Sequence, residues 1–203
     1  MPLFPLSREE IARRLARPAP RPTAEDRHLF GLPSGAQATE AAVMLPLVHR
    51  EGEVNVLFTQ RTAHLADHAG QISFPGGRVE PEDVSREVTA LRETEEEIGL
   101  PRDRIDVLAR LPLYEVPSGF RITPVVGWIE APFTLQLDAF EVAEVFEVPV
   151  EHFLRLENYV RRDYHFRGRH RHYLAVPYEG RYIWGATAGM LYSFCSALLA
   201  EGR

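Results

Sequence analysis

The acidic stretch at residues 92–97 carries side chains whose spacing could bind a metal ion. On an α-helix, residues three and four apart share a face, so Glu93, Glu96 and Glu97 should project together. These carboxylates repel one another, and the C-terminal end of the helix on which they lie disfavours negative charge further. Because hard divalent cations prefer carboxylate oxygens, two or three bound ions would turn this repulsion into attraction. The stretch therefore predicts a divalent metal site, with a solvated charged face as the alternative.

Arg92 and a preceding glycine pair extend this candidate site. Arg92 can reach Glu95 or Glu96 one turn further along the helix, and its forked guanidinium can fix the rotamer of a carboxylate. Gly76 and Gly77 lack side chains and would bring the backbone close to whatever the acidic face binds. The expected site thus joins one helix to the turn before it.

The charge of the chain is concentrated in the same region. Residues 82–98 hold seven acids and two arginines, which account for −5 of the formal net charge of −6. This balance argues against a strong general affinity for nucleic acid. No run of 18 apolar residues suggests a membrane span, and the first residues lack the apolar core of a secretory signal. The single cysteine, Cys195, excludes an internal disulfide and should be a buried small hydrophobe. We expect a cytoplasmic protein.

The elements that must position the acidic face predict an α/β fold. Residues 83–98 should form the acidic helix, with Gly99 as its C-terminal cap. Strands are expected before it at 40–48, 55–59 and 71–74, and after it at 105–114, 122–129, 144–148, 159–166, 170–176 and 182–184. Residues 186–200 should form a closing, mostly buried helix. Strands on both sides of one central helix indicate a mixed sheet between helical layers.

The N-terminal segment differs from the rest of the chain. Ser7 followed by Glu10 is a capping box, which predicts a short helix through about Arg17. Three prolines between residues 18 and 22 should end that helix and stiffen a linker. We therefore expect two parts, an N-terminal helix with a proline-rich linker at residues 1–35 and the main domain at residues 36–203. Neither part indicates the oligomeric state.

The acidic stretch resembles the signature of the Nudix hydrolase family, G-x5-E-x7-R-E-U-x-E-E-x-G-U, in which U is a bulky aliphatic residue. The matching positions are Gly77, Arg92, Glu93, Glu96, Glu97 and Gly99. Three features depart from this pattern. The first glutamate of the signature falls on Asp83, eight residues rather than seven then lead to Arg92, and Thr94 takes an aliphatic position. The roles of Asp83 and of neighbouring Glu82 stay open.

A second resemblance narrows the family to one subgroup. Residues 57–65 (LFTQRTAHL) and 68–77 (HAGQISFPGG) are similar to the segment that precedes the signature in coenzyme A pyrophosphatases. Those enzymes also carry the extra residue within the signature and an aspartate at the position of Asp83. Residues 141–149 (EVAEVFEVP) and 184–188 (WGATA) are similar to further stretches of the subgroup. The resemblance covers about residues 38–200.

This resemblance implies a fold and an activity. The fold would be a Nudix-type α/β/α sandwich with a mixed central sheet, preceded by the short N-terminal helix. The enzyme would use Mg²⁺ or Mn²⁺ to cleave the diphosphate of coenzyme A into 3′,5′-ADP and 4′-phosphopantetheine. One alternative keeps the chemistry but changes the substrate to ADP-ribose, NADH or another dinucleotide. A second alternative is a non-catalytic Nudix-fold binding module, against which the intact acidic cluster argues.

The resemblance also implies roles for individual residues. The metal ligands would be Glu93, Glu96 and Glu97, and the substrate contacts would be Arg61, Gly76 and Gly77. Arg92 would orient carboxylates. The general base stays open between Glu96 and Glu144, because either could take a proton from the attacking water. Residues 161–171, rich in arginine and histidine, are either a second anion site or an exposed basic face.

Overall fold

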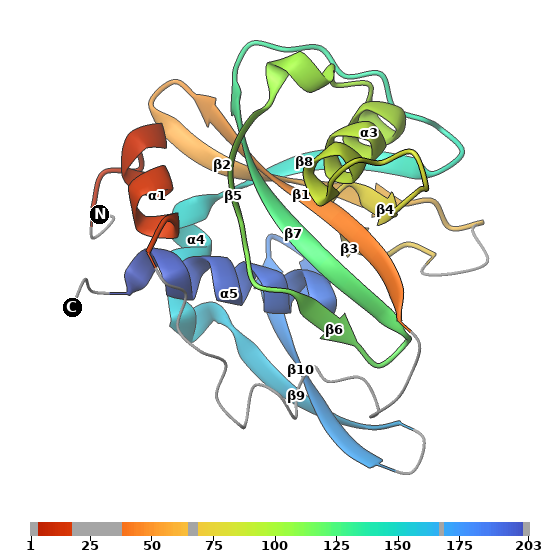
Figure 1. The fold of residues 1–203 in the computed structure, drawn as a ribbon. Coiled ribbons are helices and arrows are strands. Elements are labelled where there is room, and N and C mark those ends of the chain that lie inside the picture. The colour runs from red at the N-terminus through yellow and green to blue at the C-terminus, as the bar shows by residue number, and fades with distance from the viewer. Residues whose placement is uncertain (1–3, 18–37, 65–68, 167–168, 201–203) are drawn as a thin grey trace.

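We describe the chain from a computed structural model, which covers residues 4–17, 38–64, 69–166 and 169–200. The proline-rich linker expected between the N-terminal helix and the main domain lies outside these described residues. A mixed sheet and the helices around it make up most of the fold (Figure 1).

The central sheet has eight strands. Its main path runs through β3 (Ile72–Ser73), β2 (Glu53–Arg61), β1 (Thr39–Arg50), β7 (Phe120–Glu130) and β5 (Asp106–Arg110). Three further strands pair with this path: β4 (Gly76–Arg78) with β1, β6 (Tyr114–Val116) with β7, and β8 (Val142–Pro149) with β2. Strands β1 and β7 run parallel, whereas the other pairs are antiparallel. The expectation of a mixed sheet is confirmed.

A second sheet and the helices complete the fold. The second sheet holds β9 (Val160–Phe166), β10 (Arg169–Tyr178) and β11 (Arg181–Trp184). The helices are α1 (Arg8–Leu15), α3 (Arg86–Ile98), α4 (Val150–Leu154) and α5 (Ala186–Leu199), with short 3₁₀ turns at η1 (Arg102–Arg104) and η2 (Leu156–Asn158). Helix α4 and both turns were not expected from the sequence, because elements of three to five residues leave no periodic pattern.

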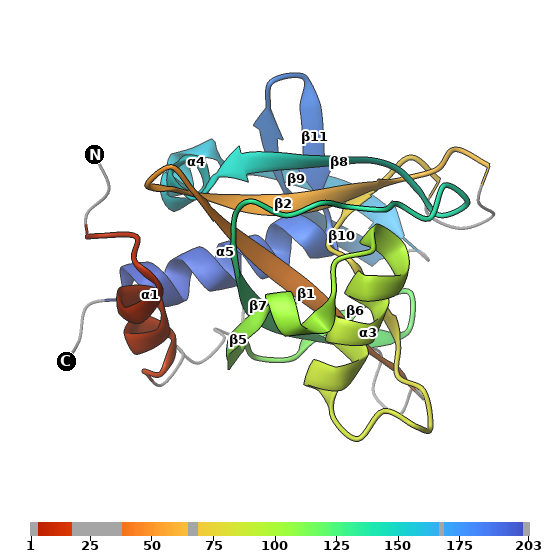
Figure 2. The same cartoon turned by 90° about the horizontal axis from the view of Figure 1, so that it is seen from above.

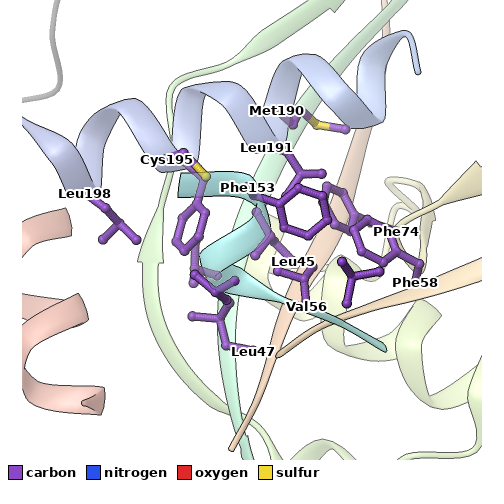
Figure 3. Close-up of a cluster of buried hydrophobic side chains, with 14 of the residues drawn as sticks. Leu45, Leu47, Val56, Phe58, Phe74, Phe153, Met190, Leu191, Cys195 and Leu198 are labelled. Atoms are coloured by element: carbon purple, nitrogen blue, oxygen red, sulfur yellow. The ribbon is translucent and has the colours of Figure 1, made fainter. Parts of the chain in front are cut away.

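Successive apolar side chains along the buried strands point to opposite faces of the central sheet and so form two hydrophobic cores, one on each face. Leu45 and Leu47 of β1 point into the core that contains α5, whereas Met44 and Val48 point into the core that contains α3. Figure 3 shows the first core, which includes side chains of α5 together with Val56, Phe58, Phe74 and Phe153. Helices α3 and α5 therefore cover opposite faces of the sheet, as Figure 2 also shows, and the α/β/α sandwich is confirmed.

The N-terminal helix belongs to the same core as the C-terminal helix. Ser7 Oγ accepts a hydrogen bond from the backbone N–H of Glu10, so the expected N-cap of α1 is confirmed. Ile11 is fully buried in the core with α5. Arg14 donates to the carbonyl oxygen of Leu198 at 2.7 Å. Apolar burial and a partly buried hydrogen bond from a cationic side chain thus dock α1 on α5. The domain boundary near residue 35 stays a prediction.

The acidic helix begins later than its composition suggested and ends where it was expected. Ser85, in an extended conformation, caps α3 by accepting from the backbone N–H of Val88. Asp83 instead accepts from the N–H of Glu80 in a turn before the helix, so the predicted start at residue 83 is wrong by three residues. At the other end, Gly99 is left-handed with a φ of 67°, which a residue without Cβ adopts readily.

Two further expectations can be checked against the described residues. Cys195 is fully buried, and burial raises the pKa of its thiol to about 12, so the interpretation as a small core residue is confirmed. Among the helices of the described ranges, none is long and apolar enough to span a bilayer.

Candidate active site

The acidic helix faces the glycine turn of residues 76 and 77, which β4 holds by pairing with β1. A Cβ atom placed on Gly77 would collide with the carboxylate of Glu93. The backbone of Gly76 forms a hydrogen bond with Glu97, an interaction that favours the charged carboxylate. The glycine pair thus brings backbone against the acidic face, as its lack of side chains suggested.

Glu97 is the most deeply buried acid of this face. Its exposed fraction is 6%, and loss of hydration raises its pKa to about 8. The negative charges of Glu93 and Glu141 raise that pKa further, whereas the Gly76 backbone and the positive charge of Arg61 lower it. Without a cation, Glu97 is therefore largely protonated near neutral pH, and a bound cation would favour its ionised form.

Glu93 and Glu96 share the helix face with Glu97 but differ from each other in exposure. The Glu93 side chain is 17% exposed, and burial raises its pKa against the opposing effect of Arg92. The Glu96 side chain is 56% exposed and accepts from Arg92 Nη1 at 3.1 Å. The predicted cluster thus consists of two inward carboxylates and one at the solvent-exposed rim.

Arg92 holds this cluster together. Its Nη1 donates to Glu93 at 2.9 Å as well as to Glu96, so one guanidinium positions two acids of the face. The expected contact with Glu96 is confirmed. The alternative contact with Glu95 is not formed, because Glu95 accepts from Arg102 Nε at 2.7 Å instead.

Asp83 is the residue that fixes Arg92. Its side chain is 3% exposed and accepts from Arg92 Nη2 at 2.9 Å and Nε at 3.2 Å. Thr89 Oγ1 and the backbone N–H of Glu80 donate to the same carboxylate. These contacts hold the pKa of Asp83 well below its usual range, chiefly through the hydrogen bonds from Arg92. Asp83, which stands where the Nudix signature has a glutamate, therefore positions Arg92. The neighbouring Glu82 is exposed.

The segment between β7 and β8 closes over the C-terminal end of the acidic helix. The backbone N–H groups of Gln136 and Asp138 donate to the carbonyl oxygens of Ile98 and Glu97, both at 2.9 Å. The chain then turns at Asp138, whose carbonyl accepts from Glu141 N–H at 3.0 Å. These bonds satisfy carbonyl groups that a helix end leaves unpaired and place Glu141 beside the acidic face.

Glu141 is a site residue that sequence reasoning missed. Its carboxylate lies 3.8 Å from Arg61 Nη1, and its charge raises the pKa of both Glu93 and Glu97. The available signal was its place at the start of residues 141–149, the stretch that resembles coenzyme A pyrophosphatases. The same stretch holds Glu144, for which we expected a role in catalysis, and the sequence alone does not show which of the two acids faces α3.

Arg61, which the resemblance implies as a phosphate contact, borders Glu97 of the acidic face. Its positive charge acts on Glu97, and its side chain is 27% exposed. Its Nε is buried and has no hydrogen-bond partner among the described residues. A buried guanidinium N–H without a partner is costly, and an anionic oxygen arriving at this point would satisfy it.

Glu144 lies on the other face of the sheet. It stands opposite Gln60 in the β2–β8 pairing, and directly paired residues of antiparallel strands share a face. Arg181 donates to both of its carboxylate oxygens, at 2.6 and 3.0 Å, and lowers its pKa. The structure therefore does not bring Glu144 to the acidic face, and its role as a base stays a prediction.

The basic stretch of residues 161–171 is also separate from this face. It forms most of the β9–β10 hairpin, and β10 contributes to the core around α5 (Figure 1). Arg161 is exposed and donates to the ring of His172 at 2.7 Å, while Arg167 lies outside the described residues. That residues 161–171 form a second anion site stays a prediction.

The carboxylates fit a partly hydrated divalent ion. In the described ranges, no three acidic, histidine or cysteine side chains are grouped so that they could hold an ion by themselves. Mg²⁺ is commonly bound by one or two carboxylates, with waters and substrate phosphates as its other ligands. Glu93 and Glu97 face inward, and burial raises the pKa of both despite the nearby Arg92 and Arg61, so a divalent ion would favour their ionised forms.

The two glycines of the turn should respond differently to alanine. In Gly77→Ala the new methyl group can be accommodated if the flexible end of Glu93 moves, so we expect a folded protein with at least tenfold lower activity. In Gly76→Ala the methyl group meets the backbone of Ala42 and Val43 at 2.5 and 2.6 Å, so we expect a large loss of stability. Thermal denaturation and steady-state rates of both variants check this, and a fully active Gly77→Ala enzyme would contradict the placement of Glu93.

Comparison with known proteins identifies the family of the chain. The family model of the NUDIX domain matches residues 38–167. The Nudix hydrolase NudL of Yersinia enterocolitica is 43% identical over 157 residues, which cover 77% of this chain and 80% of that protein. NudL of Cronobacter sakazakii is 41% identical over 158 residues, covering 78% and 82% respectively.

Similar solved structures are more distant in sequence. An Ap4A hydrolase of C. elegans has a TM-score of 0.47 and 21% identity, with 56% of this chain and 82% of that chain covered.

The family model matches more than half of the chain, and both NudL proteins are over 40% identical to it across most of their length. The chain therefore belongs to the Nudix hydrolase family.

Proposed function

We propose that this Nudix hydrolase cleaves the diphosphate of coenzyme A and its derivatives, with Mg²⁺ or Mn²⁺, into 3′,5′-ADP and 4′-phosphopantetheine. One observation carries the substrate assignment. Residues 57–65 and 68–77, which resemble the corresponding segment of coenzyme A pyrophosphatases, supply Arg61 and the glycine turn, and both lie against the acidic face. The residues that resemble the subgroup are thus the residues that border the proposed catalytic centre.

Glu93 and Glu97 are the proposed direct metal ligands, with Glu96 as a further ligand at the exposed rim. When bound, a divalent ion neutralises phosphate charge and lowers the pKa of a coordinated water. Arg92 keeps Glu93 and Glu96 in place through its paired hydrogen bonds. Because its hydrogen bonds go to carboxylates, Arg92 would orient these acids rather than bind the substrate.

Arg61 is the proposed phosphate contact. Its guanidinium borders the acidic face, and its unpartnered Nε can donate to a diphosphate oxygen. Gly76 and Gly77 would contact the substrate through their backbone, since Glu93 and the Ala42–Val43 backbone fill the space that side chains would need. The ion pair between Arg61 and Glu141 is loose, with 3.8 Å between nitrogen and oxygen, so Arg61 can turn to an anion that enters the site.

Three acids are candidates for the general base. Glu96 is exposed on the acidic helix, Glu141 lies beside Arg61, and Glu144 is paired with Arg181 on the opposite face. We favour Glu96 or Glu141, since Glu144 would first have to leave its two hydrogen bonds. Rate–pH profiles of the three Glu→Gln variants decide among them, because loss of the base removes the acidic limb of the profile.

Product analysis tests the substrate. The purified chain is incubated with coenzyme A and Mg²⁺, and the nucleotides are separated by chromatography. We expect 3′,5′-ADP and 4′-phosphopantetheine in equal amounts. Absence of both at micromolar enzyme, together with turnover of ADP-ribose or NADH, would transfer the assignment to another nucleoside diphosphate derivative. Absence of turnover on every substrate would favour a binding module.

Binding of Mg²⁺ should also raise the stability of the protein. A cation that binds only the folded state stabilises it by RT ln(1 + [L]/Kd), about 2.7 kcal/mol at a concentration 100 times Kd. For a chain of this size that corresponds to a rise in Tm of several degrees. Thermal denaturation with and without Mg²⁺ measures the rise. The same rise in a Glu93→Gln, Glu97→Gln double variant would place the binding elsewhere.

A further inference from the structure

A cavity of about 630 Å³ lies on the face of the sheet opposite the acidic helix. One wall comes from Gln60 at the end of β2 and from residues 69–72. The other wall comes from the turn between β10 and β11 and from β11 itself, with Arg181, Tyr182 and Trp184. Its volume is typical of sites that hold a small organic molecule.

The cavity and the acidic face are separated by a single strand end. Gln60 lines the cavity, whereas the next residue, Arg61, acts on Glu97. Successive side chains of a strand point to opposite faces, which explains how neighbours serve two sites. The two sites therefore lie on opposite faces of the sheet, at the same end of β2.

The charges around the cavity disfavour an anion. Arg181 is held by two hydrogen bonds to Glu144, and its guanidinium stacks on Phe146 with its Cζ 3.7 Å from the ring centroid. Glu144 lies outside the cavity lining, but another acid, Glu179, is part of it. Arg181, the one arginine among the described residues that line the cavity, is therefore neutralised by an ion pair, and the occupant should be an uncharged group.

Aromatic side chains give the cavity an apolar wall. Tyr182 and Trp184 are 43% and 38% exposed, although large aromatic side chains are usually well covered. The ring of Tyr173 packs edge-on against Trp184 with centroids 5.2 Å apart, which restrains the indole. The amide of Gln60 adds hydrogen-bonding capacity on the opposite wall. Together these groups suit a ligand that combines apolar carbon with amides.

We infer that this cavity receives the pantetheine arm of coenzyme A, while the diphosphate lies at the acidic face. The arm is uncharged, carries two amides and is long and flexible. The adenosine end carries a 3′-phosphate, for which the cavity offers no unpaired arginine in its described walls. The inference rests on the proposed function, because it assigns a second part of the same substrate.

Tryptophan fluorescence tests the binding without any turnover. The chain has two tryptophans: Trp128 is 2% exposed, and Trp184 lines the cavity. Titrating the metal-free protein with pantetheine should give a saturable change in emission that Trp184→Phe abolishes. Titration with 3′,5′-ADP should leave the emission unchanged. A response to 3′,5′-ADP and none to pantetheine would overturn the inference.

Kinetics with coenzyme A provide the second test. Tyr182→Ala should raise KM about tenfold with little change in kcat, since it removes a ground-state contact remote from the diphosphate. Leu113→Ala is the matched control, because it removes an exposed apolar side chain that does not line the cavity, and its KM should stay at the wild-type value. Equal KM values in Tyr182→Ala and the wild type would contradict the placement.

The two tests separate this inference from the proposed function. Hydrolysis of coenzyme A with no response of Trp184 to pantetheine would refute the cavity assignment and leave the activity intact. A saturable response of Trp184 without hydrolysis of coenzyme A would refute the activity and leave a pantetheine-binding cavity.

Discussion

Glu97→Gln is expected to lower the rate of hydrolysis by about three orders of magnitude while leaving the metal-free protein folded. Glutamine has nearly the same shape but cannot supply the negative charge that a divalent ion needs, and such an ion contributes several kcal/mol to stabilising the transition state. Glu97 is almost fully buried and forms a hydrogen bond with the Gly76 backbone, so the change acts inside a preformed site. Single-turnover rates with saturating Mg²⁺ measure the loss.

The same variant should change how stability depends on pH. Glu97 has an ordinary pKa of 4.5 and a pKa of about 8 in the folded protein. Between these values the folded state keeps a proton that the unfolded state releases, so the free energy of unfolding falls as pH rises from about 4.5 to about 8. Glu97→Gln removes this contribution, and its stability should exceed that of the metal-free wild type at pH 8.

Urea denaturation at pH 5 and pH 8, in the presence of a chelator, measures both effects. We expect the difference between variant and wild type to grow by an amount on the order of a few kcal/mol between the two pH values. Glu95→Gln is the matched control on the same helix, because Glu95 is exposed and pairs only with Arg102 in the described contacts. If the free energy of unfolding of Glu97→Gln and of the wild type depended on pH in the same way, the raised pKa of the buried Glu97 would be contradicted.

Asp83→Asn is expected to destabilise the protein by about 3 kcal/mol and to lower its activity. Removing one partner of a buried ion pair leaves the other charge uncompensated, which costs several kcal/mol. The Asp83 and Arg92 side chains are 3% and 12% exposed. Because Arg92 also positions Glu93 and Glu96, its release should disturb the acidic face as well as the fold.

Equilibrium unfolding and kcat measurements on the same preparation test this expectation. Glu95→Gln again serves as the control, since the Glu95–Arg102 pair is exposed and should cost less than about 1 kcal/mol. The folded pKa of Asp83 is depressed, so its contribution is present above the unfolded pKa and is lost as pH falls toward the folded one. A variant as stable and active as Glu95→Gln would show that Arg92 does not depend on Asp83.

Local spacing was enough to predict the acidic helix and its direction. Glu93 and Glu97 are four residues apart, and any helix places such residues on one face whatever surrounds it. Gly99 marked the C-terminal end because a left-handed cap favours a residue without Cβ. Most strand segments could likewise be predicted, since strand-favouring composition is a property of the local sequence.

The partners of the acidic face could not be derived in this way. Glu141 and Glu144 are three residues apart in one acidic stretch, and the sequence offered no means of choosing between them. The pairing of β8 with β2 places Glu144 opposite Gln60 and turns it toward Arg181. The turn at Asp138 brings Glu141 to Arg61 instead. The roles of these acids in catalysis stay predictions.

The sequence by itself determined which side chains share the acidic helix face, that a glycine turn precedes them, and that a mixed sheet lies between helices. The tertiary structure alone decided that Asp83 anchors Arg92, that Glu141 rather than Glu144 borders Glu97, and that α1 docks on α5. The physical reason is the range of the forces. Helical periodicity and capping act over a few residues, whereas strand register, burial and ion pairing depend on segments that meet only when the chain folds.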